Sequence, residues 1–197
     1  MGNIPEAVLS EIKRDSVKSG IPIISEAAAE FILELIKNAN PSNILEIGTG
    51  HGYSGTLMLS AVSAKLCTVE IDETRFLKSK ENFEAAGITQ NVTQHLLDAA
   101  EFLRIASGKY DFIFLDGAKG QYLNMLSDLK RLLSRGGLLV SDNIFYHGFV
   151  DGSVKLRKNR LTLVENLKAF IEKLTGDKEL STEFFRIGDG ISVSRKL

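Results

Sequence analysis

The chain has 197 residues, of which 44% are hydrophobic and 25% charged, with 24 Lys and Arg against 25 Asp and Glu. This composition is typical of one globular domain that buries roughly 70% of its unfolded surface, so its folding needs no disulfide or metal staple. The formal charge of −1 excludes binding to nucleic acid or to an anionic membrane through whole-protein charge, and leaves only a local basic patch open.

The one cysteine, Cys67, cannot form an intrachain disulfide, which suits a reducing compartment. Every apolar run is shorter than the ~18 residues of a membrane span, and the first residues lack the apolar core of a signal peptide. We therefore expect a cytoplasmic protein with no membrane partner.

Two helices are predicted before residue 41. Apolar residues recur at helical spacing from Pro5 to Lys18, and Ser25 is a suitable N-cap for a second helix that ends at Ala39. We expect this segment, residues 1–40, to cover the ligand site of a single domain that spans residues 1–197.

From residue 43 onward, short apolar runs alternate with longer amphipathic stretches. The runs predict five strands, at residues 43–47, 66–71, 92–97, 110–115 and 138–141. The stretches predict helices near residues 53–63, 73–86, 99–106 and 121–133, with suitable helix stops at Gly87, Gly108 and Gly136. This alternation predicts a parallel sheet that is covered by helices on both faces.

The C-terminal segment predicts a helix at residues 161–174 and then a hairpin of residues 182–186 and 191–195, so at least one strand should run antiparallel. The predicted fold class is therefore α/β. In sheets of this kind ligands bind beyond the carboxyl ends of the strands. The informative residues should follow those ends.

The segment after the first predicted strand is rich in glycine, which lets the backbone turn tightly and approach a ligand. A phosphate-binding loop is excluded because Thr56 stands where that loop needs Lys. A dinucleotide fingerprint matches Gly50, Gly52 and Gly55, with Glu70 near the position of a ribose-binding acid. A lone match of this type is weak, and a nicotinamide cofactor stays open as an alternative.

S-adenosylmethionine fits the surrounding residues better, because it has no phosphates and its amino group and ribose are hydrogen-bond donors. Three acids stand at or near successive strand ends, namely Glu46, Glu70 and Asp98. The alternative for Glu70 and Asp98 is that they are helix-entry acids stabilised by the helix dipole. The three acids together favour the methyl donor.

Oxygen-bearing side chains follow the fourth and fifth predicted strands. Asp116 follows the fourth strand, and Asp142 and Asn143 follow the fifth. Such hard oxygen ligands suit Mg²⁺ or a similar cation, which could bind an acceptor hydroxyl and lower its pKa. Lys119 is the candidate general base or electrostatic partner. Any one of these residues alone would more often be a loop cap or a solvated charge.

Four segments in order, LEIGTGHGYSG, TVEID, YDFIFLDGAKGQY and GGLLVSDN, resemble the class I S-adenosylmethionine-dependent O-methyltransferases of the catechol and caffeoyl-CoA type. The resemblance covers most of the chain and implies a Rossmann-like, seven-stranded, mostly parallel sheet with one antiparallel strand, and a homodimer. It implies a divalent metal at Asp116, Asp142 and Asn143, with Lys119 and Asp116 as catalytic residues. The cofactor site that it implies consists of Ile24, Glu46, Gly48, Gly50, Ser54, Glu70, Asp98, Ala99 and Asp116.

A closer resemblance is to the bacterial branch that methylates 5-hydroxyuridine in the tRNA anticodon loop. It rests on IPII at residues 21–24, on DGAKGQY, and on HGFVDGSVKLRKNR, whose cations suit phosphate contacts. These cations are Lys155, Arg157, Lys158 and Arg160. A sequence pI of about 6.3 and the lack of a recognisable RNA-binding module in the sequence speak against RNA. A small catechol-like or hydroxylated aromatic acceptor therefore stays open.

Two further classes also stay open, a nicotinamide-dependent oxidoreductase and a non-catalytic RNA-binding protein that retains this fold. His51, His95 and His147 show no metal-ligand spacing, and we assign them no function. Phe145 and Tyr146 are explained at least as well by packing as by stacking on a base.

Overall fold

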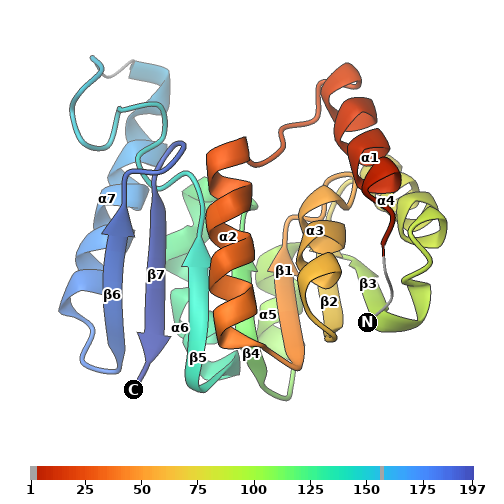
Figure 1. Cartoon of the computed structure of the whole chain (residues 1–197). Helices are drawn as coiled ribbons and strands as arrows, with labels where there is room; N and C mark the ends of the chain where they lie inside the picture. Colours follow the sequence, from red (N-terminus) through yellow and green to blue (C-terminus); the bar gives the residue numbers. More distant parts are fainter. Residues whose placement is uncertain (1–3, 156–157) are drawn as a thin grey trace.

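A seven-stranded sheet forms the centre of the computed structural model, which describes residues 4–155 and 158–197 (Figure 1). The strands are β1 (Asn43–Ile47), β2 (Lys65–Glu70), β3 (Val92–Leu96), β4 (Tyr110–Leu115), β5 (Leu133–Ser141), β6 (Leu180–Phe185) and β7 (Ile191–Lys196). Their order across the sheet is β3, β2, β1, β4, β5, β7, β6. Neighbours are parallel, except that β7 runs antiparallel to β5 and β6. The predicted α/β fold class is confirmed.

Helices cover both faces of this sheet (Figure 1). They are α1 (Glu6–Lys18), α2 (Glu26–Ala39), α3 (Tyr53–Ala61), α4 (Glu73–Ala85), α5 (Ala99–Ile105), α6 (Tyr122–Leu132) and α7 (Leu161–Gly176), with short 3₁₀ turns η1 (Thr89–Asn91), η2 (Lys119–Gln121) and η3 (Lys158–Arg160). Side chains of α1 to α4 belong to one core cluster, and those of α5 to α7 to the other. Within the described ranges, no helix has the length and apolar character that crossing a membrane requires.

Strand side chains alternate between these two clusters. Ile44, Phe112 and Phe114 belong to the cluster of α1 to α4, whereas Leu45 and Ile113 belong to the cluster of α5 to α7. All five side chains are fully buried. Because both faces of the sheet are covered, the central strands are continuous apolar runs, which explains why the sequence predicts them.

Polar side chains cap the N-termini of three helices. Ser25 Oγ accepts the N–H of Ala28 at 3.2 Å and so caps α2, as predicted. Asp72 caps α4 and Asp98 caps α5 through their carboxylates. Asp72 and Asp98 follow the ends of β2 and β3, so α4 and α5 begin at the sheet edge where the predicted ligand site lies.

One predicted strand boundary is wrong by five residues, whereas the other strand boundaries agree to within two residues. β5 begins at Leu133, whereas the sequence predicts a strand only from residue 138. Gly136, predicted to stop a helix, therefore lies inside the strand with a φ of +78°. The error arises because Leu132 and Leu133 continue the apolar pattern of α6, while the strand pairing that starts at Leu133 depends on β4, which is distant in sequence.

Candidate active site

A cavity of about 430 Å³ opens at the carboxyl ends of β1, β2 and β4. The order of the strands reverses between β1 and β4, and open α/β sheets bind their ligands at such a point. The volume suits a small-molecule cofactor. From the predicted site, the residues that line it are Ile24, Gly48, Gly50, Ser54, Glu70, Asp98, Ala99, Asp116, Lys119 and Asn143.

The glycine-rich loop after β1 runs against the end of β4. Gly48 has a φ of +100°, and a Cβ at this position would collide with the main-chain oxygen of Asp116. Both the conformation and the lack of space therefore require glycine at Gly48. The loop is brought so close to β4 that backbone from both strand ends lines one cavity.

Glu70 joins this loop to the end of β2. Its Oε2 accepts the N–H of Gly50 at 2.9 Å, and its Oε1 accepts the N–H groups of Ile71 and Asp72 at 3.0 Å each. The side chain is 6% exposed and lines the cavity. Because a carboxylate has about four acceptor positions, Glu70 is held rigidly and still has capacity for a donor such as a ribose hydroxyl.

Glu46 lies beneath the glycine-rich loop rather than at its surface. Its fully buried carboxyl group accepts the hydroxyl of Ser54 at 2.5 Å and that of Thr68 at 2.6 Å. Burial raises the pKa of Glu46 to about 7, and the two hydroxyl hydrogen bonds act in the opposite direction. Glu46 therefore positions Ser54, which lines the cavity, whereas Glu46 is not among the residues that line it. A direct contact of Glu46 with the cofactor stays a prediction.

Asp98 is a helix cap and also part of the cavity wall. Its Oδ1 accepts the N–H groups of Ala100 at 2.9 Å and Glu101 at 3.1 Å, which makes it the N-cap of α5. It also lines the cavity together with Ala99. A side chain fixed by the start of a helix is thus presented to the ligand site.

The connection between α1 and α2 forms one wall of the cavity. Its apolar residues, Ile21 to Ile24, all line the cavity, and Ile24 is 5% exposed. The N-terminal region therefore contributes to the site through this connecting segment. Ion pairs of Lys13 with Glu26 at 2.6 Å and of Lys78 with Asp15 at 3.2 Å hold α1 against α2 and α4.

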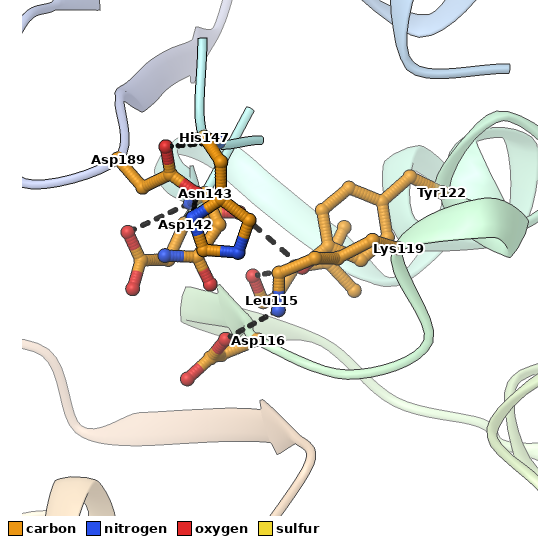
Figure 2. A network of polar contacts seen from close by, with 8 residues as sticks. All are labelled: Leu115, Asp116, Lys119, Tyr122, Asp142, Asn143, His147 and Asp189. Atoms are coloured by element: carbon orange, nitrogen blue, oxygen red, sulfur yellow. Dashed lines mark hydrogen bonds and ion pairs between the residues drawn. The ribbon is translucent and has the colours of Figure 1, made fainter. Parts of the chain in front are cut away.

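Asp116, Asp142 and Asn143 come together at the ends of β4 and β5. These strands are adjacent and parallel, with Leu115 paired to Ser141, so the residues that follow stand at the same edge. Figure 2 shows the two carboxylates and the Asn143 amide turned toward one another. Lys119 Nζ lies 3.4 Å from Asp116 Oδ1. The structure therefore brings the predicted metal ligands and the predicted catalytic lysine into one oxygen cluster.

This oxygen cluster fits a divalent cation. Burial raises the pKa of Asp116, and burial together with the nearby Asp116 charge raises the pKa of Asp142 to about 7. Among the described residues, no three or more His, Cys, Asp and Glu side chains are placed to hold a metal ion together. The amide oxygen of Asn143 would therefore serve as the third protein ligand beside Asp116 and Asp142. A hard cation such as Mg²⁺ takes oxygen ligands of these types and would offset the repulsion between the carboxylates.

Tyr122 supports the oxygen cluster from below, a role that the sequence does not reveal. Its fully buried hydroxyl donates to the main-chain oxygen of Leu115 at 3.1 Å and contacts that of Asp142 at 3.4 Å. The ring packs edge-on against Phe170 at 5.5 Å between centroids. Its position on the apolar face of α6 indicates a core residue, and only the strand topology shows that its hydroxyl reaches two strand ends.

The structure describes part of the basic segment, residues 155–160. Lys155 is exposed, and the Arg160 guanidinium carbon lies 5.9 Å from the centre of the Tyr146 ring. Lys158 belongs to η3, and Arg157 lies outside the described residues. Contact of these cations with RNA stays a prediction.

Comparisons with known proteins agree with this geometry. A family model described as O-methyltransferase matches residues 4–197. A protein assigned as a caffeoyl-CoA O-methyltransferase in Arabidopsis thaliana is 30% identical over 177 residues, which cover 85% of this chain and 75% of the relative.

Solved structures show the same fold. A protein assigned as a caffeoyl-CoA O-methyltransferase from Staphylococcus aureus superposes with a TM-score of 0.88 at 30% identity, over 96% of this chain and 92% of that one. An O-methyltransferase from Bacillus cereus, crystallised with S-adenosylhomocysteine, gives a TM-score of 0.86 at 21% identity, over 98% of this chain and 92% of that one.

Proposed function

The chain belongs to the O-methyltransferase family, and we propose that it transfers the methyl group of S-adenosylmethionine to a hydroxyl group with the help of a divalent cation held by Asp116, Asp142 and Asn143. The observation that carries the proposal is the oxygen cluster, in which these residues and Lys119 meet at the edge of a cofactor-sized cavity.

The cofactor assignment is supported by the acceptors that face the cavity. Glu70 and Asp98 present carboxylates to it, which suits the donor groups of S-adenosylmethionine. Family membership also removes the nicotinamide alternative, so the literal match of Gly50, Gly52 and Gly55 to a dinucleotide fingerprint is coincidental.

The residues of the site divide the work of methyl transfer. When bound, the cation would polarise the acceptor hydroxyl and S-adenosylmethionine would supply the methyl group. Lys119 Nζ, beside Asp116, would take the hydroxyl proton or stabilise the oxygen anion. The apolar wall of Ile21 to Ile24 excludes water, and the rigid Glu70 fixes the position of the donor.

For the acceptor we propose 5-hydroxyuridine in a tRNA anticodon loop. Lys155 and Arg160 belong to the stretch that leads from Asn143 to α7, and Arg160 lies beside Tyr146, so these cations are suited to bind phosphates of an RNA acceptor. A flipped-out hydroxypyrimidine would present adjacent oxygens to the cation. A small hydroxylated aromatic is the second candidate, favoured by the caffeoyl-CoA names of the relatives.

Labelled cofactor distinguishes the two acceptors. The protein is incubated with Mg²⁺ and tritium-labelled S-adenosylmethionine, in parallel with hypomodified tRNA that carries 5-hydroxyuridine and with a panel of catechols. We expect label in the tRNA, and nuclease digestion should place it in the anticodon loop. Labelling of catechols alone would contradict the RNA acceptor and support the second candidate. A reaction without protein serves as the blank for both acceptors.

A further inference from the structure

A second cavity, of about 300 Å³, lies on the segment between β5 and α7 and is lined by Tyr146, His147, Phe149 and Arg160. The Tyr146 ring centroid lies 5.1 Å from that of His147 and 5.9 Å from that of Phe149. The Arg160 guanidinium carbon lies 5.9 Å from the same ring. Aromatic faces and a cation thus share one hollow, the aromatic cavity, to which methyl transfer itself assigns no role.

The aromatic cavity adjoins the oxygen cluster. The His147 N–H donates to the Asp189 carboxylate, and His147 Nδ1 lies 3.5 Å from Asp189 Oδ2. Figure 2 shows His147 and Asp189 beside Asp142 and Asn143. A ligand whose reacting hydroxyl lies at the oxygen cluster can therefore extend into the aromatic cavity with its next unit.

The backbone at Tyr146 and His147 has an unusual conformation. Tyr146 has a φ of +44° and His147 a φ of +56°, a region that residues with a Cβ rarely adopt. Hydrogen bonds fix this turn: Phe145 N–H donates to Asp189 O at 3.0 Å, and Phe149 N–H donates to Tyr146 O at 3.1 Å. Such strained backbone occurs preferentially at ligand sites, because the surrounding structure must be built to maintain it.

The two neighbouring aromatic rings have different surroundings. The Phe145 ring is covered by the Arg186 guanidinium at 5.2 Å, and Arg186 is itself fixed by an ion pair with Asp151 at 2.7 Å. Phe145 therefore anchors the segment between β5 and α7. Of these two rings, Tyr146 is the one that lines the aromatic cavity, where Arg160 also lies.

We propose that the aromatic cavity binds the nucleotide next to the methylated one, with its base stacked on Tyr146 and its phosphate near Arg160. The inference rests on the proposed RNA acceptor. Every base has a π-face that stacks on an aromatic ring, and arginine matches phosphate geometry, so this combination recognises a single-stranded nucleotide without regard to its sequence. A single-ring phenol at the oxygen cluster would not extend this far.

A double-mutant cycle between protein and RNA tests the proposal. kcat/KM is measured for wild type and Tyr146→Ala with an anticodon stem-loop that carries 5-hydroxyuridine, and with stem-loops that have an abasic residue on one or the other side of it. On one side, the abasic residue should lower the wild-type kcat/KM about tenfold, the size expected for the loss of one base–aromatic stack, and should have no further effect on Tyr146→Ala.

Two variants serve as controls, and a third tests the phosphate contact. Tyr146→Phe keeps the stacking face and should retain the wild-type kcat/KM. Phe184→Ala removes a partly exposed ring from β6, so it should respond to the abasic residue as wild type does. Arg160→Gln tests the proposed phosphate contact rather than serving as a control, and it should make RNA binding less dependent on salt.

The outcomes separate the two proposals. Losses that multiply in Tyr146→Ala, or an abasic residue that has no effect on either side, would overturn the neighbouring-nucleotide site while the RNA acceptor stands. A wild-type enzyme that does not methylate the intact stem-loop would contradict the RNA acceptor, and with it the site that depends on it.

Discussion

Glu46 is a carboxyl group without exposed surface, and it holds the hydroxyls of Ser54 and Thr68 below the glycine-rich loop. Thr68 Oγ1 also contacts Thr49 Oγ1 at 2.5 Å, so a chain of oxygen atoms fixes the loop from beneath. Because burial disfavours the charged form, the pKa of Glu46 rises to about 7. The ionisation of Glu46 should therefore make the stability of the protein depend on pH.

Replacing Glu46 with Gln should alter how stability depends on pH. The carboxyl group titrates near 4.5 in the unfolded chain and near 7 in the folded one, so below pH 4.5 both states are protonated and Glu46 carries no penalty. Between these values only the unfolded state ionises, and the free energy of unfolding should fall by up to ~3 kcal/mol and stay low above pH 7. Glu46→Gln should lack this fall.

Urea unfolding of both proteins between pH 4 and 8 measures this difference. If the free energies of unfolding of wild type and Glu46→Gln differ by the same amount at every pH, the raised pKa of Glu46 in the folded protein is contradicted. The comparison uses the free protein, so that cofactor binding does not contribute.

At the scale of elements, the central strands could be predicted because both of their faces are covered and their sequences are therefore largely apolar. β1 and β4 begin and end at the predicted residues. The start of β5 could not be predicted, since the pairing of Leu133 with Tyr110 depends on a partner strand and is absent from the local pattern. The wall formed by Ile21 to Ile24 gives no periodic signal either, because a connecting segment has none.

Gly48→Ala tests the close approach of the glycine-rich loop to β4. The added Cβ would have an unfavourable φ of +100° and would also collide with the Asp116 main chain. Gly108→Ala is the matched control, because Gly108 has a φ of +93° and no atom within 4 Å of the added Cβ. We expect a loss of about 1–2 kcal/mol for the control from conformation alone, and a larger loss for Gly48→Ala.

Chemical unfolding of the two variants checks this expectation. Equal losses would show that the backbone of the loop can move away from β4 at no cost. In that case the loop would not be rigid enough to fix a bound cofactor by itself.

At the scale of the whole molecule, topology explains which parts of the site could be predicted. Asp116 and Asp142 could be assigned to one cluster because both follow strands that a parallel sheet places side by side. The sequence could not show, however, that Glu46 lies below the glycine-rich loop while Glu70 lines the cavity. Both stand near strand ends, and only the packing of α3 on the sheet shows that Ser54 covers one of them. Asp189 reaches the site from the β6–β7 hairpin, far away in sequence.

The cofactor should stabilise the whole chain, since the cavity is built from the ends of several elements. At S-adenosylmethionine concentrations of about 100 times Kd, binding adds ~2.7 kcal/mol to the free energy of unfolding. For a chain of this length the melting temperature should rise by about 5–10 °C. NADH should leave it unchanged, and a rise with NADH alone would contradict the cofactor assignment. Differential scanning calorimetry provides both measurements.

The most direct test of metal-assisted methyl transfer is the rate of label transfer from tritium-labelled S-adenosylmethionine to whichever acceptor is labelled, measured after EDTA treatment and again after Mg²⁺ is restored. EDTA should abolish transfer by wild type and Mg²⁺ should restore it. Asp142→Ala should stay inactive at every Mg²⁺ concentration while it still binds the cofactor in calorimetry. Full activity in EDTA, or in Asp142→Ala, would contradict the role of the oxygen cluster as a cation site.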